Sequence, residues 1–254
     1  MKILGILFSI LMLLALTTVT YAQDKTLVLA LSFDEGQGNV AGDSSQYKFN
    51  AAIKGPIWVN GKYGKALSFD GVDDTVEVAD APELRLLKGG TVMAWVYILG
   101  GGHASWPRLI HKSNTTGGTG PGYEILFDRA LSDSVRVCLG GECQTYTPTK
   151  RETWHHVALT FDGKAVKVYV DGGAAAEKPQ LGPVIDNSAM ALVLGNSFNA
   201  QRQFQGNIDE VRIWARVMSI DEIKAQMNMT TNNVITSVAP HLKLSTVWAK
   251  VKNN

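Results

Sequence analysis

Hydrophobic and polar residues alternate, or gather in short apolar runs, along most of this chain. The runs are rich in Val, Ile, Phe, Tyr and Trp and are bounded by Gly, Asp, Asn and Pro, which is typical of β-strands. Many short strands with turn residues between them and almost no helical periodicity indicate a β-sandwich or barrel. The predicted strands are Thr26 to Phe33, Ala66 to Asp70, Thr75 to Ala79, Thr91 to Ile98, Arg108 to Lys112, Tyr123 to Asp128, Ser134 to Leu139, Trp154 to Phe161, Ala165 to Val170, Ala191 to Gly195 and Ile208 to Trp214.

Two Asp-Gly pairs mark predicted tight turns. Asp162-Gly163 lies between two strands and Asp171-Gly172 closes the second of them, and this dipeptide favours hairpin turns. The adjacent His155 and His156 stand in the strand before these turns, so their side chains should face opposite sides of the sheet. We therefore interpret the two histidines as packing residues and not as a metal or catalytic pair.

A single helix is predicted after the last strand, from about Ile220 to Asn228. Ser219 can cap it and Glu222 completes a capping box, while Met218 and Ile223 have the spacing of a hydrophobic staple.

Three ordered segments carry a family resemblance: Gly64 to Asp74, Trp154 to Gly172, and Phe204 to Trp214 with the helix that follows. Together they resemble the laminin-G-like family of concanavalin A-like (pentraxin-like) jelly rolls, over roughly Thr26 to Asn228. The resemblance implies an all-β fold: a two-sheet antiparallel jelly-roll sandwich with one short C-terminal helix. It also implies loops at one rim that are available to ligands.

Residues 1–22 are typical of a signal peptide, with Lys2 before an apolar run and Thr20-Tyr21-Ala22 before the expected cleavage site. The run is shorter than the roughly 20 residues of a membrane span. We expect residues 23–228 to form one jelly-roll domain. After removal of the signal peptide, this domain should be secreted, either to the periplasm or to the extracellular space. Residues 229–254 are interpreted as a polar linker, which includes Thr230 to Asn233, and a short basic tail.

Charge excludes some partners. The chain has 24 basic and 23 acidic residues, and the basic residues are scattered and form no stripe. This distribution does not favour nucleic acid or an anionic membrane as a partner.

The two cysteines, Cys138 and Cys143, flank a Gly140-Gly141 pair. A two-residue turn at these glycines would place the cysteines opposite each other at a non-hydrogen-bonded pair, about 4.5 Å apart between Cα atoms. That separation suits a disulfide, which an exported protein favours; two free thiols are the alternative.

Acidic residues at strand ends and in Gly-rich loops provide oxygen ligands of the kind that calcium prefers. By resemblance to the superfamily, which often holds a calcium between an early loop and the closing strand, we place Asp34, Asp43 and Asp209 at such a site. The alternative is that these residues act as ordinary turn formers.

Ligand recognition is predicted in two glycine-rich loops, Gly100 to Trp106 and Thr115 to Tyr123, which flank one short strand. An exposed Trp can stack on a sugar ring while polar side chains supply hydrogen bonds, although Trp106 could instead cover the sandwich edge. The candidate ligand-binding residues are His103, Trp106, Arg108, Asn114 and Tyr123.

No catalytic motif is found in the sequence. Glycosidases of this fold carry paired carboxylates on one strand, and the nearest pair here, Glu124 and Asp128, is four residues apart. We expect no enzyme activity. The leading hypothesis is a secreted lectin-like module that binds a glycan or cell-surface glycoconjugate, with a structural calcium. The alternatives are a protein-binding or adhesion module and, less favoured, a glycoside hydrolase with an atypical site.

Overall fold

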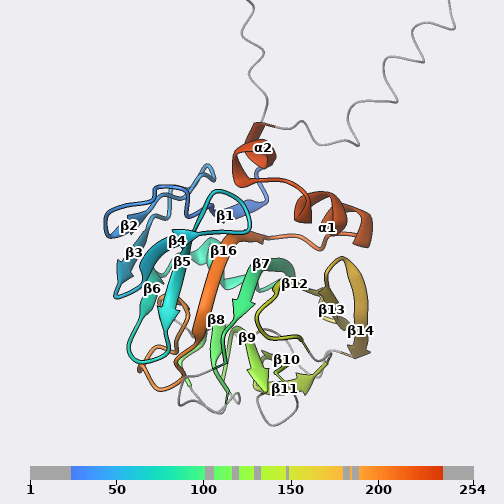
Figure 1. Ribbon diagram of the computed structural model, residues 1–254. Coiled ribbons are helices and arrows are strands. Elements are labelled where there is room, and N and C mark those ends of the chain that lie inside the picture. The colour runs from blue at the N-terminus through green and yellow to red at the C-terminus, as the bar shows by residue number, and fades with distance from the viewer. Residues whose placement is uncertain are drawn as a thin grey trace, which may run out of the picture.

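The protein is described here by a computed structural model that covers residues 24–100, 106–115, 120–128, 133–146, 149–179, 184 and 189–236. Its strands form two antiparallel sheets packed face to face (Figure 1). This arrangement confirms the predicted jelly-roll sandwich. The expected signal peptide and basic tail lie outside the described residues. Within the described ranges, no helix has both the length and the apolar character needed to span a membrane.

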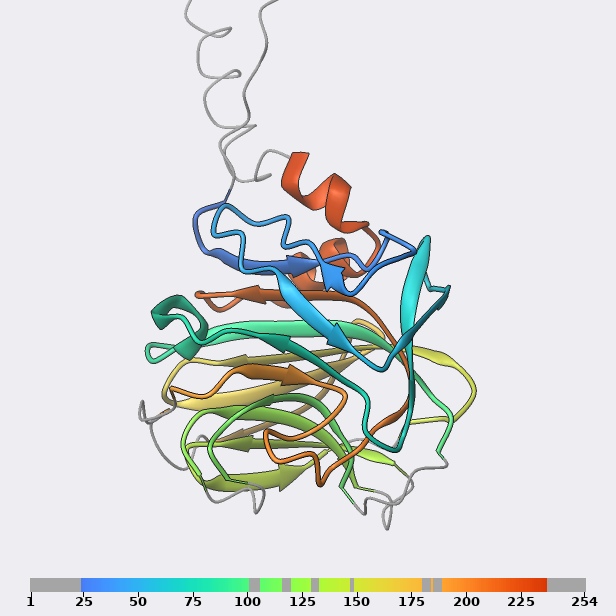
Figure 2. The ribbon, with the colours of Figure 1, turned by 90° about the vertical axis from the view of Figure 1, so that its left-hand side faces the viewer.

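The first sheet, called the front sheet, is built around the closing strand. Its strands are β1 (Leu27–Leu31), β4 (Ile57–Asn60), β5 (Lys65–Asp70), β7 (Gly90–Ile98), β12 (Trp154–Phe161), β13 (Ala165–Val170), β14 (Gly173–Pro179) and β16 (Gln205–Trp214). They lie in the order β14-β13-β12-β7-β16-β5-β4, and β1 pairs with β16 outside this path. Figure 2 shows β1 beside β16, beneath the helices.

The second sheet, called the back sheet, has the order β11-β10-β9-β8-β15-β6-β3-β2. In chain order its strands are β2 (Val40–Ala41), β3 (Ala51–Lys54), β6 (Thr75–Val78), β8 (Arg108–Lys112), β9 (Tyr123–Asp128), β10 (Ser134–Leu139), β11 (Glu142–Thr145) and β15 (Leu192–Leu194). Helices are few and short: the 3₁₀ turn η1 (Pro82–Arg85), α1 (Ile220–Met227) and α2 (Thr231–Thr236).

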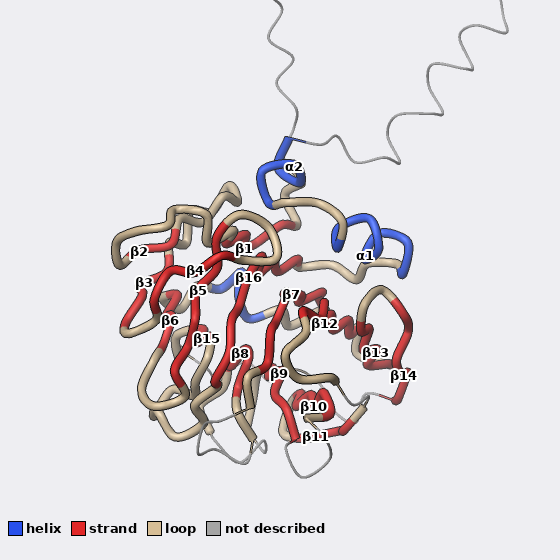
Figure 3. The backbone as a smooth tube through the Cα atoms, viewed as in Figure 1, coloured by secondary structure: helices blue, strands red, loops and turns tan. Residues whose placement is uncertain are grey.

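Strand alternation decides which side chains enter the core. On β7, Val92, Ala94 and Val96 join the main apolar core between the sheets. Met93, which alternates with them, faces outward and packs with Ile223 of α1 in a smaller apolar cluster. The C-terminal helices therefore cover part of the outer face of the front sheet, at one edge of the sandwich (Figure 3).

The predicted turns are confirmed. Asp171 and Gly172 both have positive φ and form the two-residue turn between β13 and β14. Gly140 and Gly141 do the same between β10 and β11, where Cys138 pairs with Cys143 and the two residues form a disulfide with Cα atoms 4.1 Å apart. The capping box of α1, from Ser219 to Glu222, is also confirmed.

Five strands were not predicted: β2, β3, β4, β11 and β14. Strands β3 and β14 are rich in Ala, Lys and Glu, which have little intrinsic β-propensity, and β2, β4, β11 and β14 are short or lie at sheet edges, where one neighbouring strand pairs with them. The segment Thr230 to Asn233, interpreted as a polar linker, instead forms the start of helix α2, which begins at Thr231. Thr231 is buried there and bonds to the carboxylate of Glu210, a tertiary contact that has no local sequence signal.

Candidate functional site

The two predicted binding loops lie at opposite ends of one strand. Trp106 precedes β8 and Asn114 follows it, and Tyr123 pairs with Lys112 at the far end from Arg108. Since a strand rises by about 3.3 Å per residue, β8 separates the loops by roughly 17 Å. The structure therefore does not bring the predicted ligand-binding residues together.

Tyr123 has a structural position. Its ring is fully buried in the main core, and its hydroxyl donates a hydrogen bond to the carbonyl of Leu84 at 2.8 Å. Burial raises the pKa of its phenol far above the ordinary value. His103 lies outside the described residues. Only Trp106 and Arg108 of the predicted set remain together at one place.

These two residues belong to a larger group on the outer face of the back sheet, which we call the Trp106 cluster: Trp106, Arg108, His111, Glu124, Arg136 and Arg202. On β9, Glu124 alternates with core residues and so faces outward, and the strand register places His111 of β8 beside it. Arg136 of β10 and Arg108 of β8 flank the same position of β9 from either side. Arg202 comes from the loop between β15 and β16.

The indole of Trp106 is 40% exposed and lies beside two guanidinium groups. The central carbon of Arg202 is 5.4 Å from the ring centroid and that of Arg136 is 5.9 Å from it. Both distances are within the range of cation–π attraction. No local sequence pattern indicates Arg136 or Arg202, because they reach the site only through strand pairing and from a distant loop.

A buried ion pair forms the floor of the cluster. Arg108 Nε lies 2.7 Å from Glu124 Oε2, its Nη1 donates to the carbonyl of Trp106 at 2.8 Å, and His111 Nδ1 is 3.5 Å from the same Glu124 oxygen. Burial by itself raises the pKa of Glu124, but the contacts with His111 and Arg108 outweigh it and hold that pKa below the ordinary value. Glu124 is thus an ionised counter-charge.

Glu124 and Asp128 are poorly placed for glycoside hydrolysis. They lie on the same face of β9, four residues apart, so their backbone positions are separated by about 13 Å. Paired carboxylates of glycosidases are about 5 to 9.5 Å apart. Each is also engaged by an arginine, Glu124 by Arg108 and Asp128 by Arg136 at 3.5 Å.

Asp34 and Asp209 come together on the other sheet. Asp209 Oδ2 accepts a hydrogen bond from the amide of Tyr63 at 3.0 Å, and Asp34 Oδ1 accepts one from the amide of Lys65 at 2.9 Å. Both carboxylates therefore hold the turn between β4 and β5. A Cβ at Gly61 would lie 2.7 Å from Asp209 Oδ2, so the turn requires glycine there to approach this closely.

The second oxygen of Asp209 is buried and has no hydrogen-bond partner among the described residues. Burial is the main reason that the pKa of Asp209 is raised to about 8, and the nearby carboxylates of Glu210 and Asp34 contribute to this rise against the hydrogen bond from the Tyr63 amide. A buried carboxylate oxygen without a partner is an available ligand for a hard cation.

Asp43 has a different role. Its carboxylate accepts four hydrogen bonds: from the amides of Ala30, Ser45 and Phe49 and from the Ser45 hydroxyl. A carboxylate has about four lone-pair sites, so these bonds leave none for a cation. Asp43 fastens the loop after β2 to β1 and is not available as a third ligand beside Asp34 and Asp209.

Three further aspartates, Asp70, Asp73 and Asp74, have ligand oxygens within 4.8 Å of one another. Asp74 accepts a hydrogen bond from the amide of Asp70, and Asp70 accepts one from the amide of Val72. These bonds are those of a tight turn after β5, and they account for the cluster without a metal.

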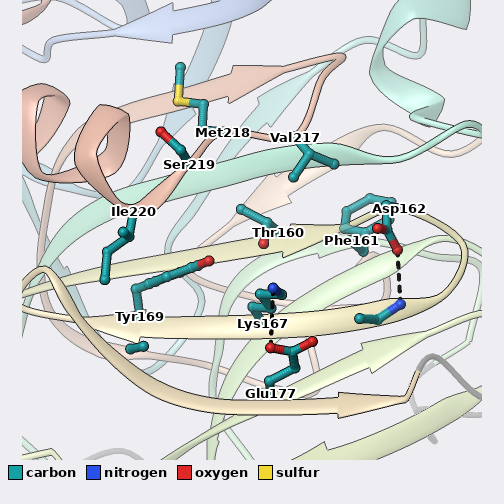
Figure 4. Close-up of a pocket in the computed structure, with 12 residues that line it drawn as sticks. Thr160, Phe161, Asp162, Lys167, Tyr169, Glu177, Val217, Met218, Ser219 and Ile220 are labelled. Carbon is teal, nitrogen blue, oxygen red and sulfur yellow. Dashed lines mark hydrogen bonds and ion pairs between the residues drawn. The ribbon is translucent and has the colours of Figure 1, made fainter.

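A groove of about 540 Å³ lies on the outer face of the front sheet (Figure 4). Val217, Ser219 and Ile220, from the β16–α1 connection and the start of α1, form one wall, and the ion pair between Lys167 and Glu177, 3.1 Å apart, lies across from them. The groove mixes apolar and paired polar groups.

A family model described as the concanavalin A-like lectin/glucanases superfamily matches residues 70–224 of this chain. Among curated proteins, pappalysin-1 of Mus musculus is 27% identical over 151 residues. That alignment covers 58% of this chain and 9% of pappalysin-1, so the chain corresponds to a small part of that protein.

Solved structures share the fold at low identity. Domain 4 of AbnA, an extracellular arabinanase from Geobacillus stearothermophilus, in complex with arabinotriose, has a TM-score of 0.61 and 19% identity, covering 79% of this chain and 98% of that one. The binding domain of botulinum neurotoxin DC, in complex with rat synaptotagmin II, has a TM-score of 0.60 and 13% identity, covering 82% of this chain and 52% of that one.

Proposed function

Because this chain belongs to the concanavalin A-like lectin/glucanases superfamily, we propose that it is a non-catalytic, extracellular module that binds carbohydrate. The observation that carries the proposal is the exposed indole of Trp106, set among arginines on the outer face of the back sheet. Aromatic rings beside hydrogen-bond donors are the side chains that bind sugars. Domain 4 of AbnA, which shares the fold, is in complex with arabinotriose, and this supports a saccharide as the ligand.

The carboxylates of the described residues support binding without catalysis. A retaining or inverting glycosidase needs one carboxyl group that is protonated at working pH and a second one close to it. Glu124 has a lowered pKa, and Asp128 lies too far along the strand. Export from the cytoplasm accords with the signal-like sequence of residues 1–22 and with the disulfide between Cys138 and Cys143.

A structural calcium is part of this proposal, held by Asp209 and Asp34. The partnerless oxygen of Asp209 supports it, since a buried carboxylate oxygen that no protein group bonds can serve as a ligand to a hard cation. Such a cation would fasten the turn between β4 and β5 to β16. Its role is to stabilise the fold, because the pair lies on the front sheet, away from the Trp106 cluster.

The second candidate is a protein-binding module, favoured by the groove of Figure 4. Its partly apolar walls and the solvent-exposed ion pair between Lys167 and Glu177 suit contact with a peptide. The binding domain of botulinum neurotoxin DC, which has the same fold, is in complex with synaptotagmin II.

A glycan array run with calcium and with a chelator separates these functions. We expect saccharide binding by the wild type, and a loss of about tenfold to a hundredfold in Trp106→Ala, as removal of a stacked ring costs about 1 to 3 kcal/mol. Trp58→Ala, on edge strand β4, is the control and should bind like the wild type. The absence of any glycan ligand, together with a protein ligand whose binding is lost in Val217→Asp, would favour the second candidate instead.

A further inference from the structure

We propose that the Trp106 cluster selects acidic saccharides, through an oxyanion on the sugar that is bound by Arg202 and Arg136. This inference rests on the proposed carbohydrate function and adds the chemical class of its ligand. It follows from the arrangement of charge around the indole, which a site for neutral sugars does not require.

The guanidinium groups lie close to the indole on which a sugar would stack. Arg202 and Arg136 are 5.4 and 5.9 Å from the centroid of the Trp106 ring, so a sugar that approaches the indole meets their donors. A guanidinium presents a planar fork of N–H groups that matches a carboxylate or a sulfate. The ring and the forks together suit a sugar that carries such a group.

The charges of the cluster are not balanced within the described residues. Arg108 pairs with Glu124, and Arg136 lies 3.5 Å from Asp128, but Arg202 has no ion pair there. The Nε of Arg202 is buried without a hydrogen-bond partner, which is costly for a charged group. Residues 101–105 and 129–132, the chain segments next to Trp106 and Asp128, contain no Asp or Glu.

The arginines also repel one another. Burial lowers the pKa of Arg108 despite its partner Glu124, and the charges of Arg202 and Arg136 contribute to that lowering. An anion placed between Arg202 and Arg136 would relieve this repulsion and supply the partner that Arg202 lacks. The front sheet offers a contrast, because the buried Arg212 has protein partners for its side chain.

The test compares saccharides that differ only in charge, using the full secreted chain. Oligogalacturonate against its methyl ester tests a carboxylate, and dextran sulfate against dextran tests a sulfate. We expect at least one acidic member to bind about tenfold or more tightly than its neutral partner, with an affinity that falls as salt rises. Which pair shows the preference identifies the oxyanion.

Arg202→Gln should lose this preference, and Arg202→Lys should retain part of it because the charge stays while the fork is lost. Lys54→Gln removes the same charge from the outer face of the same sheet and is the matched control. Melting temperatures of the variants show whether each is folded.

The inference is overturned if the neutral partners bind as tightly as the acidic ones, or if Arg202→Gln loses no more affinity than Lys54→Gln. In those cases binding of neutral saccharides that depends on Trp106 would leave the proposed function standing. Absence of all saccharide binding, on the array and in these assays, would reject both.

Discussion

Each outer face of the sandwich carries one buried arginine–glutamate pair, and the two pairs differ in the groups that surround them. On the front sheet, Arg212 and Glu210 are both about 2% exposed, and their remaining polar atoms bond to Thr231 and to carbonyls at the end of α1. On the back sheet, Arg108 and Glu124 are equally buried, but the groups above them are an exposed indole and a guanidinium with a partnerless nitrogen.

The difference separates structural polar groups from those available to a ligand. A buried network whose members are all satisfied fixes one conformation, here the seating of α1 and α2 on the front sheet. A network that is incomplete within the chain can be completed by a ligand. The front pair should therefore govern stability, and the back cluster should govern binding.

Glu210→Ala should produce the largest change in stability. It leaves Arg212 buried without its counter-charge and removes the bonds that hold Thr231, so the free energy of unfolding should fall by about 3 to 5 kcal/mol. Denaturant titration measures this. Glu177→Ala breaks an exposed ion pair in the same sheet and should cost no more than about 1 kcal/mol. Equal losses in the two variants would contradict the assigned role of the front pair.

Asp209→Asn tests the proposed calcium. In chelator, folded Asp209 has a pKa of about 8 against an ordinary 3.8, so the folded state keeps a proton that the unfolded state releases. The stability of the wild type relative to the variant should therefore decline as pH rises from about 4 to 8. The buried His156, whose pKa burial lowers to about 3, destabilises the fold as pH falls below about 6.5. That effect should be equal in both proteins.

Adding calcium at neutral pH should stabilise the wild type more than Asp209→Asn. The wild type should gain about 2.7 kcal/mol at a hundredfold excess over the dissociation constant, and Asp209→Asn should gain little. Thermal melts with calcium and with chelator measure the gain. Glycan affinity of the folded protein should stay the same, because the pair is on the front sheet. A wild type that does not respond to calcium would rule the site out.

Removal of the disulfide should give the smallest change. The bond between Cys138 and Cys143 closes a loop of only a few residues, so Cys138→Ser with Cys143→Ser should cost about 2 kcal/mol or less. Cys138 also pairs with Glu124 across β9 and β10, next to the Trp106 cluster. Equilibrium unfolding gives the cost, and a loss larger than that of Glu210→Ala would invert our ordering of the two faces.

Local patterns predicted the elements that carry their own signal. The short apolar runs of β7 and β12, the Asp171-Gly172 and Gly140-Gly141 turns and the capping box of α1 are all found in the structure, because each depends on residues within a few positions of one another. The disulfide could also be predicted from the sequence, since a two-residue turn determines which residues of the two strands face each other. Edge strands such as β14 were missed because a partner strand, not their own propensity, makes them extended.

The sites depended on contacts between distant residues. Alternation and turn chemistry are local properties, and by themselves they determined a β-sandwich or barrel with its hairpins. The family resemblance implied the two-sheet jelly roll and the metal role of Asp209. Only the tertiary structure decided that Trp106 and Tyr123 lie at opposite ends of β8, and that Arg136 and Arg202 replace Asn114 and Tyr123 around the indole. It also decided that the carboxylate of Asp43 is saturated by three amides and a hydroxyl. Strand order and register bring together residues that are far apart in the chain, and no local pattern records them.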